Sequence, residues 1–230
     1  MQTAHLLFTG VTLHPVLLAA GAKAATTVTA QVDPRLWYVT RAAAISAYVA
    51  LALATGLGLL RSLARTLGVG VSWALDDLHQ FVSLLAAAFV GLHLLSLLLD
   101  PFLPFPLVSL LLPIAEPTRP LANALGVLGL YALAVVLVSS WLRRRITHRL
   151  WRGLHYVSFV AFALVTLHGL FAGSDTTQPW MRATYTGAAA SIAFLVLMRL
   201  LVARRAPLSV DEADTVVNLP APWPETSGLR

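Results

Sequence analysis

The chain contains five apolar runs of about 20 residues, and their length constrains the fold more than any other feature. A helix of that length crosses the ~30 Å hydrocarbon core of a bilayer. The runs lie at about residues 38–60, 76–99, 121–142, 151–172 and 183–203. They predict an all-α fold, an integral membrane helical bundle of five to six transmembrane helices surrounded by lipid.

The sixth helix depends on the N-terminal segment, residues 1–35. Residues 5–22 are apolar but contain a histidine–proline pair, and a proline inside a helix removes a backbone donor. We predict a short or bent first span there, with a re-entrant piece or a signal sequence as alternatives. A single transmembrane domain is expected over residues 36–205. A flexible tail rich in proline and acids is expected over residues 206–230.

Composition excludes several classes of function. The chain is 58 % hydrophobic and 11 % charged, which leaves little of it outside a bilayer. Its 16 basic residues are arginines apart from Lys23, and they cluster at the ends of the runs, so they indicate membrane topology rather than nucleic-acid binding. The chain has no cysteine, which excludes thiolate-held iron–sulfur clusters and covalently attached haem. A metal here must therefore have nitrogen or oxygen ligands.

Arginine counts predict the orientation of the bundle. Residues 143–152 hold five arginines, 199–205 hold three and 61–75 hold two, whereas the alternate loops hold one each, Arg119 and Arg182. Loops rich in arginine face the cytoplasm. We therefore predict a multi-pass protein of a bacterial-type plasma membrane with its C-terminus in the cytoplasm.

Two of the apolar runs carry a histidine near either end. His79 and His93 have thirteen residues between them, and His155 and His168 have twelve. Ionisable groups within a bilayer are costly and are usually functional. Haem iron accepts two axial imidazoles, and a b-type haem needs no covalent link. The four histidines predict two b-type haems stacked across the membrane; isolated buried histidines are the alternative.

The spacing of the histidines fits this prediction in part. His79 and His93 are separated by about 21 Å along an ideal helix and by about 40° around it, nearly one face. His155 and His168 differ by about 140°, so a tightened turn, a tilt or different ring rotamers must make up the difference. The side chains on the face between the first two histidines are small enough to leave room for macrocycles: Ser83, Ala86, Ala87 and Val90.

Two further side chains are candidates for contact with the haems. Phe162 lies midway between His155 and His168 and is predicted to pack between the two haems, with ordinary core packing as the alternative. Arg41 lies just inside its run and is predicted to pair with a propionate, because a buried arginine needs an anionic partner. The arginines of residues 143–152 are interpreted as topology signals, with propionate binding as the alternative.

The histidine pattern resembles that of the ferric reductase-like transmembrane domain over about residues 36–203. The resemblance rests on His79-x13-His93 and His155-x12-His168 on alternate helices, and on the context LHYVSFVAFALVTLHGL after an arginine block. This superfamily includes ferric reductases, NADPH oxidases and the haem-binding subunit of the bacterial periplasmic methionine sulfoxide reductase system. The resemblance implies that His79 and His155, the inner pair, hold one haem, and that His93 and His168, the outer pair, hold the other.

The resemblance implies transmembrane electron transfer, from a cytoplasmic flavin to an acceptor on the outer side. The sequence has no G-x-G-x-x-G fingerprint of a nicotinamide-binding module, so the expected donor is a separate flavoprotein reductase or a quinol. The chain is then the haem-binding electron-transfer subunit of an oxidoreductase, with a periplasmic reductase among the candidate acceptors. A quinol-linked haem subunit of a periplasmic reductase is the first alternative. A non-redox transporter or assembly factor is the second.

Overall fold

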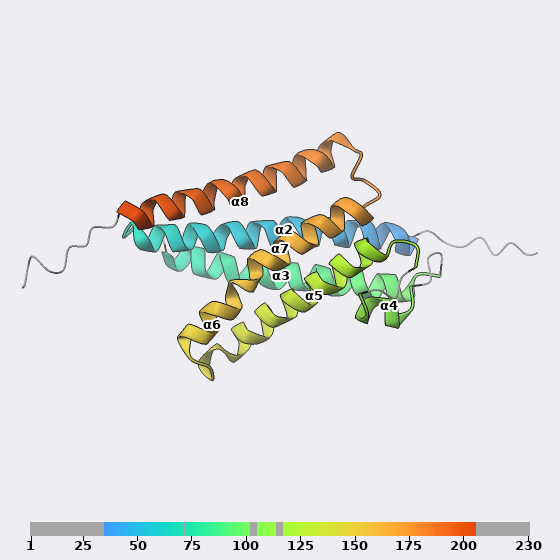
Figure 1. Cartoon of the computed structure of the whole chain (residues 1–230), viewed down its shortest axis with the longest axis horizontal. Helices are drawn as coiled ribbons and strands as arrows, with labels where there is room; N and C mark the ends of the chain where they lie inside the picture. The colour runs from blue at the N-terminus through green and yellow to red at the C-terminus, as the bar shows by residue number, and fades with distance from the viewer. Residues whose placement is uncertain (1–34, 71, 102–104, 114–116, 206–230) are drawn as a thin grey trace, which may run out of the picture. The chain divides into compact units, whose positions relative to one another are not determined.

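The structure of the chain is a computed structural model that describes residues 35–70, 72–101, 105–113 and 117–205. The predicted first span at residues 5–22 and the predicted tail at residues 206–230 lie outside this range. Within the described residues the helices are α2 (Arg35–Thr66), α3 (Ser72–Leu99), α4 (Leu107–Leu111), α5 (Pro120–Trp141), α6 (His148–His155), α7 (Val157–Ala172) and α8 (Pro179–Arg205) (Figure 1). A short 3-10 helix, η1 (Leu142–Arg144), follows α5.

Five helical segments in the described residues are long and apolar enough to cross a membrane. They are Arg35–Thr66, Trp73–Leu99, Pro120–Arg144, His148–Ala172 and Pro179–Arg204. The all-α membrane bundle predicted from the apolar runs is therefore confirmed, and the protein is a multi-pass integral membrane protein.

Helices α2 and α3 form an antiparallel hairpin, and both are longer than their apolar runs. Helix α2 continues to Thr66, and α3 begins at Ser72, a turn before the predicted start at residue 76. Gly68 allows the tight connection between them, because its φ of +69° lies in the left-handed region that favours glycine. An ion pair between Arg61 and Asp76 joins the helices beside this turn.

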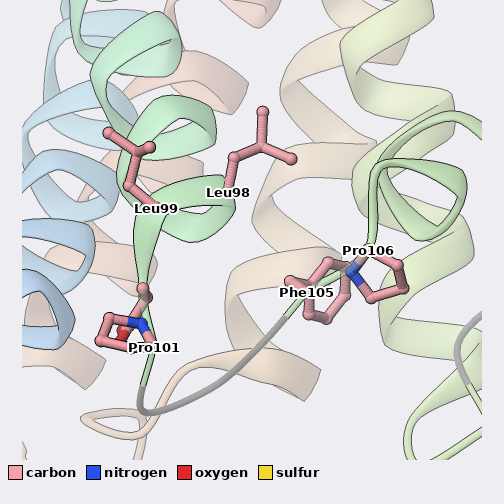
Figure 2. A pocket seen from close by; sticks show the side chains of 6 residues that line it. Leu98, Leu99, Pro101, Phe105 and Pro106 are labelled. Atoms are coloured by element: carbon pink, nitrogen blue, oxygen red, sulfur yellow. The ribbon is translucent and has the colours of Figure 1, made fainter. Parts of the chain in front are cut away.

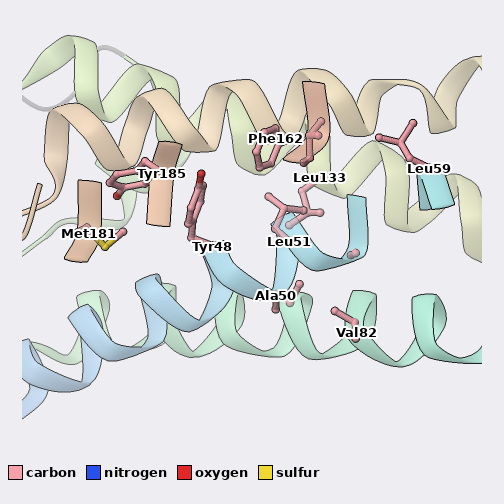
Figure 3. Packing of buried hydrophobic residues seen from close by; sticks show 12 residues of the cluster. Tyr48, Ala50, Leu51, Leu59, Val82, Leu133, Phe162, Met181 and Tyr185 are labelled. Carbon is pink, nitrogen blue, oxygen red and sulfur yellow. The ribbon is translucent and has the colours of Figure 1, made fainter. Parts of the chain in front are cut away.

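Helix α2 lies at the centre of the described bundle and packs against α3, α7 and α8. Its apolar side chains meet those of the other helices in one hydrophobic core, part of which is seen in Figure 3. The ring of Tyr48 from α2 lies 6.1 Å from that of Phe162 and 4.8 Å from that of Tyr185, measured between centroids. This aromatic group joins α2, α7 and α8.

The second histidine run forms two helices rather than one. Helix α6 ends at His155, and α7 begins at Val157. At the junction, the N–H of Phe159 donates to the carbonyl of Tyr156, a bond over three residues that is tighter than an α-helical bond. A 3-10 turn rotates the chain by about 120° per residue instead of about 100°. Among the three possibilities raised by the sequence, the structure therefore shows a tightened turn between His155 and His168.

Candidate functional site

His79 of α3 is directed toward α2. Its Nδ1 lies 2.9 Å from the carbonyl oxygen of Ala54. A carbonyl can only accept, so Nδ1 carries the proton and donates. The neutral ring then keeps Nε2 unprotonated, which is the form in which an imidazole binds a metal. The hydrogen bond also fixes the orientation of the ring, as partners of metal-binding histidines commonly do.

His93 repeats this arrangement at the other end of the hairpin. Its Nδ1 lies 3.1 Å from the carbonyl oxygen of Thr40, also in α2. The two histidines are 14 residues apart (93 − 79), and so are the two carbonyls (54 − 40). The hydroxyl of Thr40 donates to the buried hydroxyl of Ser96 at 2.8 Å, so a second hydrogen bond joins α2 and α3 beside His93. The antiparallel pairing of α2 and α3 thus positions both rings.

His168 of α7 is oriented by α5 in the same way. Its Nδ1 lies 2.7 Å from the carbonyl oxygen of Ala122. Helices α5 and α7 pack closely, and α4 is connected to α5 through a hydrogen bond from the Tyr131 hydroxyl to the Leu111 carbonyl. His168 is near enough to His93 for the two rings to interact electrostatically. The outer pair therefore comes from two helical hairpins, α2–α3 and α5–α7.

His155, at the end of α6, is held differently. Its ring stacks on that of Trp151, one turn earlier, with centroids 5.1 Å apart and planes inclined by 26°. Its Nδ1 is buried and has no hydrogen-bond partner among the described residues, and the same is true of Nε1 of Trp151. The ring faces His79, with centroids 6.2 Å apart and planes inclined by 72°. The inner pair is thus also assembled from the two hairpins.

The inner pair fits a metal held between two imidazoles. Two imidazoles that bind one metal through bonds of about 2.1 Å would have ring centroids up to roughly 6 Å apart. The described residues contain no group of three or more histidine, aspartate or glutamate side chains that could hold a metal ion directly. A porphyrin would supply the remaining ligands of a metal held between two histidines. The residues fit a bis-histidine haem.

Each histidine pair has an arginine–aspartate ion pair close by. Near the outer pair, Arg41 pairs with Asp175 of the α7–α8 loop through two hydrogen bonds, one of them 3.2 Å long from Nε. Its guanidinium also lies 4.3 Å from the ring centroid of Trp37. Near the inner pair, Arg61 pairs with Asp76 and is close enough to both imidazoles to interact with them electrostatically. Arg61 is thus a second cation beside a histidine pair, and the sequence pattern did not single it out.

Phe162 is buried in the core, where its ring stacks on that of Tyr48 with planes inclined by 19°. This contact agrees with the alternative of ordinary packing, and contact with haems stays a prediction. In the sequence Phe162 lies between His155 and His168, so its position along the spans is also between the two pairs.

Two pockets lie away from the histidine pairs. One, of about 380 Å³, is at the end of α3 and is lined by Leu98, Leu99, Asp100, Pro101, Phe105 and Pro106 (Figure 2). It follows His93 by about two turns, so it is on the outer-pair side. The other, of about 330 Å³, lies between α2 and α3 and is lined by Ile45, Ser46, Val49, Ala50, Leu53, Val82, Leu85 and Phe89.

Comparison with known proteins places the chain in a family. The model of the ferric reductase like transmembrane component matches residues 41–166, more than half of the 230 residues. The chain belongs to this family. The match contains His79, His93 and His155 and ends two residues before His168. Neither the curated proteins nor the solved structures contain a match.

Membership agrees with the resemblance read from the histidine spacing, and the geometry adds residues that spacing could not identify. Trp151, which stacks on His155, precedes it by one helical turn, a visible but common pattern. Asp175, the partner of Arg41, has no sequence signal because it is 134 residues away. The carbonyls of Ala54, Thr40 and Ala122 have none either, since every residue carries a carbonyl.

Proposed function

We propose that this member of the ferric reductase-like family transfers electrons across the membrane through two b-type haems. The inner pair, His79 and His155, would hold one haem, and the outer pair, His93 and His168, the other. Bound haem supplies reversible one-electron chemistry at its iron. The donor in this proposal is a cytoplasmic flavin on a separate protein, and the acceptor lies on the outer side.

A single observation carries the proposal: histidines from two helical hairpins come together at two depths, and backbone carbonyls orient three of them. A histidine that served only the fold would have no need of an unprotonated Nε2 near another imidazole. Here the carbonyl hydrogen bonds of His79, His93 and His168 leave that nitrogen available for a ligand bond. The apolar spans around the pairs exclude water and ions, which keeps electron transfer apart from ion leakage.

Quantification of haem against protein tests this proposal. We expect two low-spin haems per chain, with a sharp reduced α band typical of paired imidazoles. His79→Ala and His93→Ala should each lower the ratio toward one. His148→Ala is the control and should keep the ratio near two, because it removes an imidazole that contacts Trp151 and belongs to neither pair. A ratio near zero in the unmodified protein would refute the proposal and favour the transporter or assembly-factor alternative.

A quinol is the second candidate donor, and the pocket between α2 and α3 favours it. This pocket is lined by apolar side chains and the hydroxyl of Ser46, and its residues Leu53 and Leu85 are exposed on the surface of the span. A lipid-soluble quinol could therefore reach it from the bilayer. Reduction of the purified protein by a soluble reduced flavin, compared with reduction by a short-chain quinol, distinguishes the two donors. Rapid reduction by the short-chain quinol is expected only if the chain is a quinol-linked subunit.

A further inference from the structure

The carbonyls that orient His79 and His168 share a feature of their own helices. Ala54 and Ala122 each precede a glycine by four residues, Gly58 and Gly126 respectively. In an α-helix the residue four places on lies one turn along the same face, and its Cα–Cβ bond tilts back toward the N-terminus. A side chain at that position therefore partly covers the earlier carbonyl. Glycine leaves the carbonyl open to a ring from a neighbouring helix.

The imidazoles occupy the space that these glycines leave. A Cβ at Gly126 would lie 2.7 Å from both Cε1 and Nδ1 of His168. A Cβ at Gly58 would lie 3.3 Å from Cε1 of His79 and 3.6 Å from its Nδ1. Favourable carbon–carbon contacts begin at about 3.5 Å. A methyl group at Gly126 is thus incompatible with the ring position, and one at Gly58 is only crowded.

Hydrogen-bond lengths follow the same order. The bond beside Gly126 is 2.7 Å long and that beside Gly58 is 2.9 Å long. The third carbonyl, from Thr40, has Ala44 four residues later, and its bond to His93 is 3.1 Å long. The closer the ring can approach the carbonyl-bearing helix, the shorter the bond.

We propose that Gly58 and Gly126 are positioning residues for the haem ligands: each opens a backbone carbonyl that orients one axial histidine. This inference rests on the proposed haem function. This role differs from the ordinary use of glycine, which lets two helices pack closely. Gly129, in the same helix as Gly126, is an example of the ordinary use. A Cβ at Gly129 would lie 3.0 Å from Cγ2 of Val165 in α7 and near no histidine.

Gly126→Ala, Gly58→Ala and the control Gly129→Ala test the inference in the full-length protein. Gly126→Ala should weaken haem binding at the outer pair by roughly 10- to 100-fold, the usual effect of losing a partner that orients a metal ligand. Gly58→Ala should have a smaller effect, confined to the inner pair. Gly129→Ala crowds a valine side chain instead of a histidine, so it should keep both haems with unchanged electron paramagnetic resonance spectra. Because alanine is the better helix former, haem loss in Gly126→Ala cannot come from a weaker α5 helix.

A second readout does not depend on haem. In the haem-free protein labelled with ¹⁵N-histidine, Nδ1–H of His168 should be protected from exchange, and Gly126→Ala should remove that protection while Gly129→Ala keeps it. The inference is overturned if Gly126→Ala leaves both the outer haem spectrum and this signal unchanged, or if Gly129→Ala alters them equally. If the unmodified protein binds no haem, the proposed function fails, and the exchange measurement still decides whether the glycine opens the carbonyl.

Discussion

Among single residues, Arg41 and Asp175 have opposite charges at the same depth as the outer pair, so they should act on its haem in opposite directions. Reduction makes a haem more negative, and a nearby cation therefore favours the reduced form. Arg41 is only partly exposed, at 30 % of its side-chain area, and Asp175 at 16 %, so solvent screening is incomplete.

We expect Arg41→Gln to lower the midpoint potential of the outer haem and Asp175→Asn to raise it, each by something on the order of tens of millivolts. The inner haem should shift much less, because it is about 20 Å away by helix rise. Redox titration of the purified variants measures both haems. Shifts of the same sign in the two variants would mean that the ion pair acts only by holding the α7–α8 loop.

Within single elements, hydropathy predicted where the helices are but not where they end. The apolar runs indicate only the part of each helix that lies in the hydrocarbon core. Helix α2 extends beyond that part, past Arg61 and Arg65, to its turn with α3. The position of the break after His155 was not predictable, because Tyr156 is neither a proline nor a glycine and the nearest glycine, Gly153, lies inside α6. The histidines were found because ionisable groups are rare in apolar runs. Their carbonyl partners depend on the pairing of helices, which no local pattern records.

The turn between α2 and α3 offers a test of the hairpin that leaves the histidines untouched. Gly68→Ala should destabilise the protein by about 1 kcal/mol, because alanine is disfavoured at positive φ. A Cβ there would meet no atom within 4 Å, so the cost is backbone strain alone. Gly70→Ala is the control, with equal space and no positive φ. Thermal unfolding in detergent measures both, and equal midpoints would contradict the strained turn.

For the whole molecule, the arginine-rich loop between α5 and α6 predicts the orientation. We expect this loop to face the cytoplasm and the α7–α8 loop to face outward. Because the chain has no cysteine, single cysteines at Thr147 and Thr177 can report each side. A membrane-impermeant thiol reagent on intact cells should label Thr177→Cys and leave Thr147→Cys unlabelled. The reverse labelling would invert the proposed direction of electron flow.

The order of the two haems follows from that orientation. In oriented vesicles with the donor on the arginine-rich side, His168→Ala should still be reduced rapidly, because its inner haem is intact. His155→Ala should lose rapid reduction while its outer haem remains reducible by dithionite. Stopped-flow absorbance compares the two. Rapid reduction of His155→Ala together with slow reduction of His168→Ala would place electron entry at the outer pair.

The two contact points between histidine and carbonyl have the same spacing along α2 as along α3. Fourteen residues separate the two contact points on each helix, so both imidazoles meet their carbonyls only while the two lengths agree. An insertion or deletion between His79 and His93 would rotate one ring away from α2 by about 100° per residue. Such a change should persist in related chains only where the stretch between Thr40 and Ala54 has changed by the same number of residues. The separation of the two histidine pairs, and with it the distance of the proposed electron transfer, is thus set by two matched lengths of sequence.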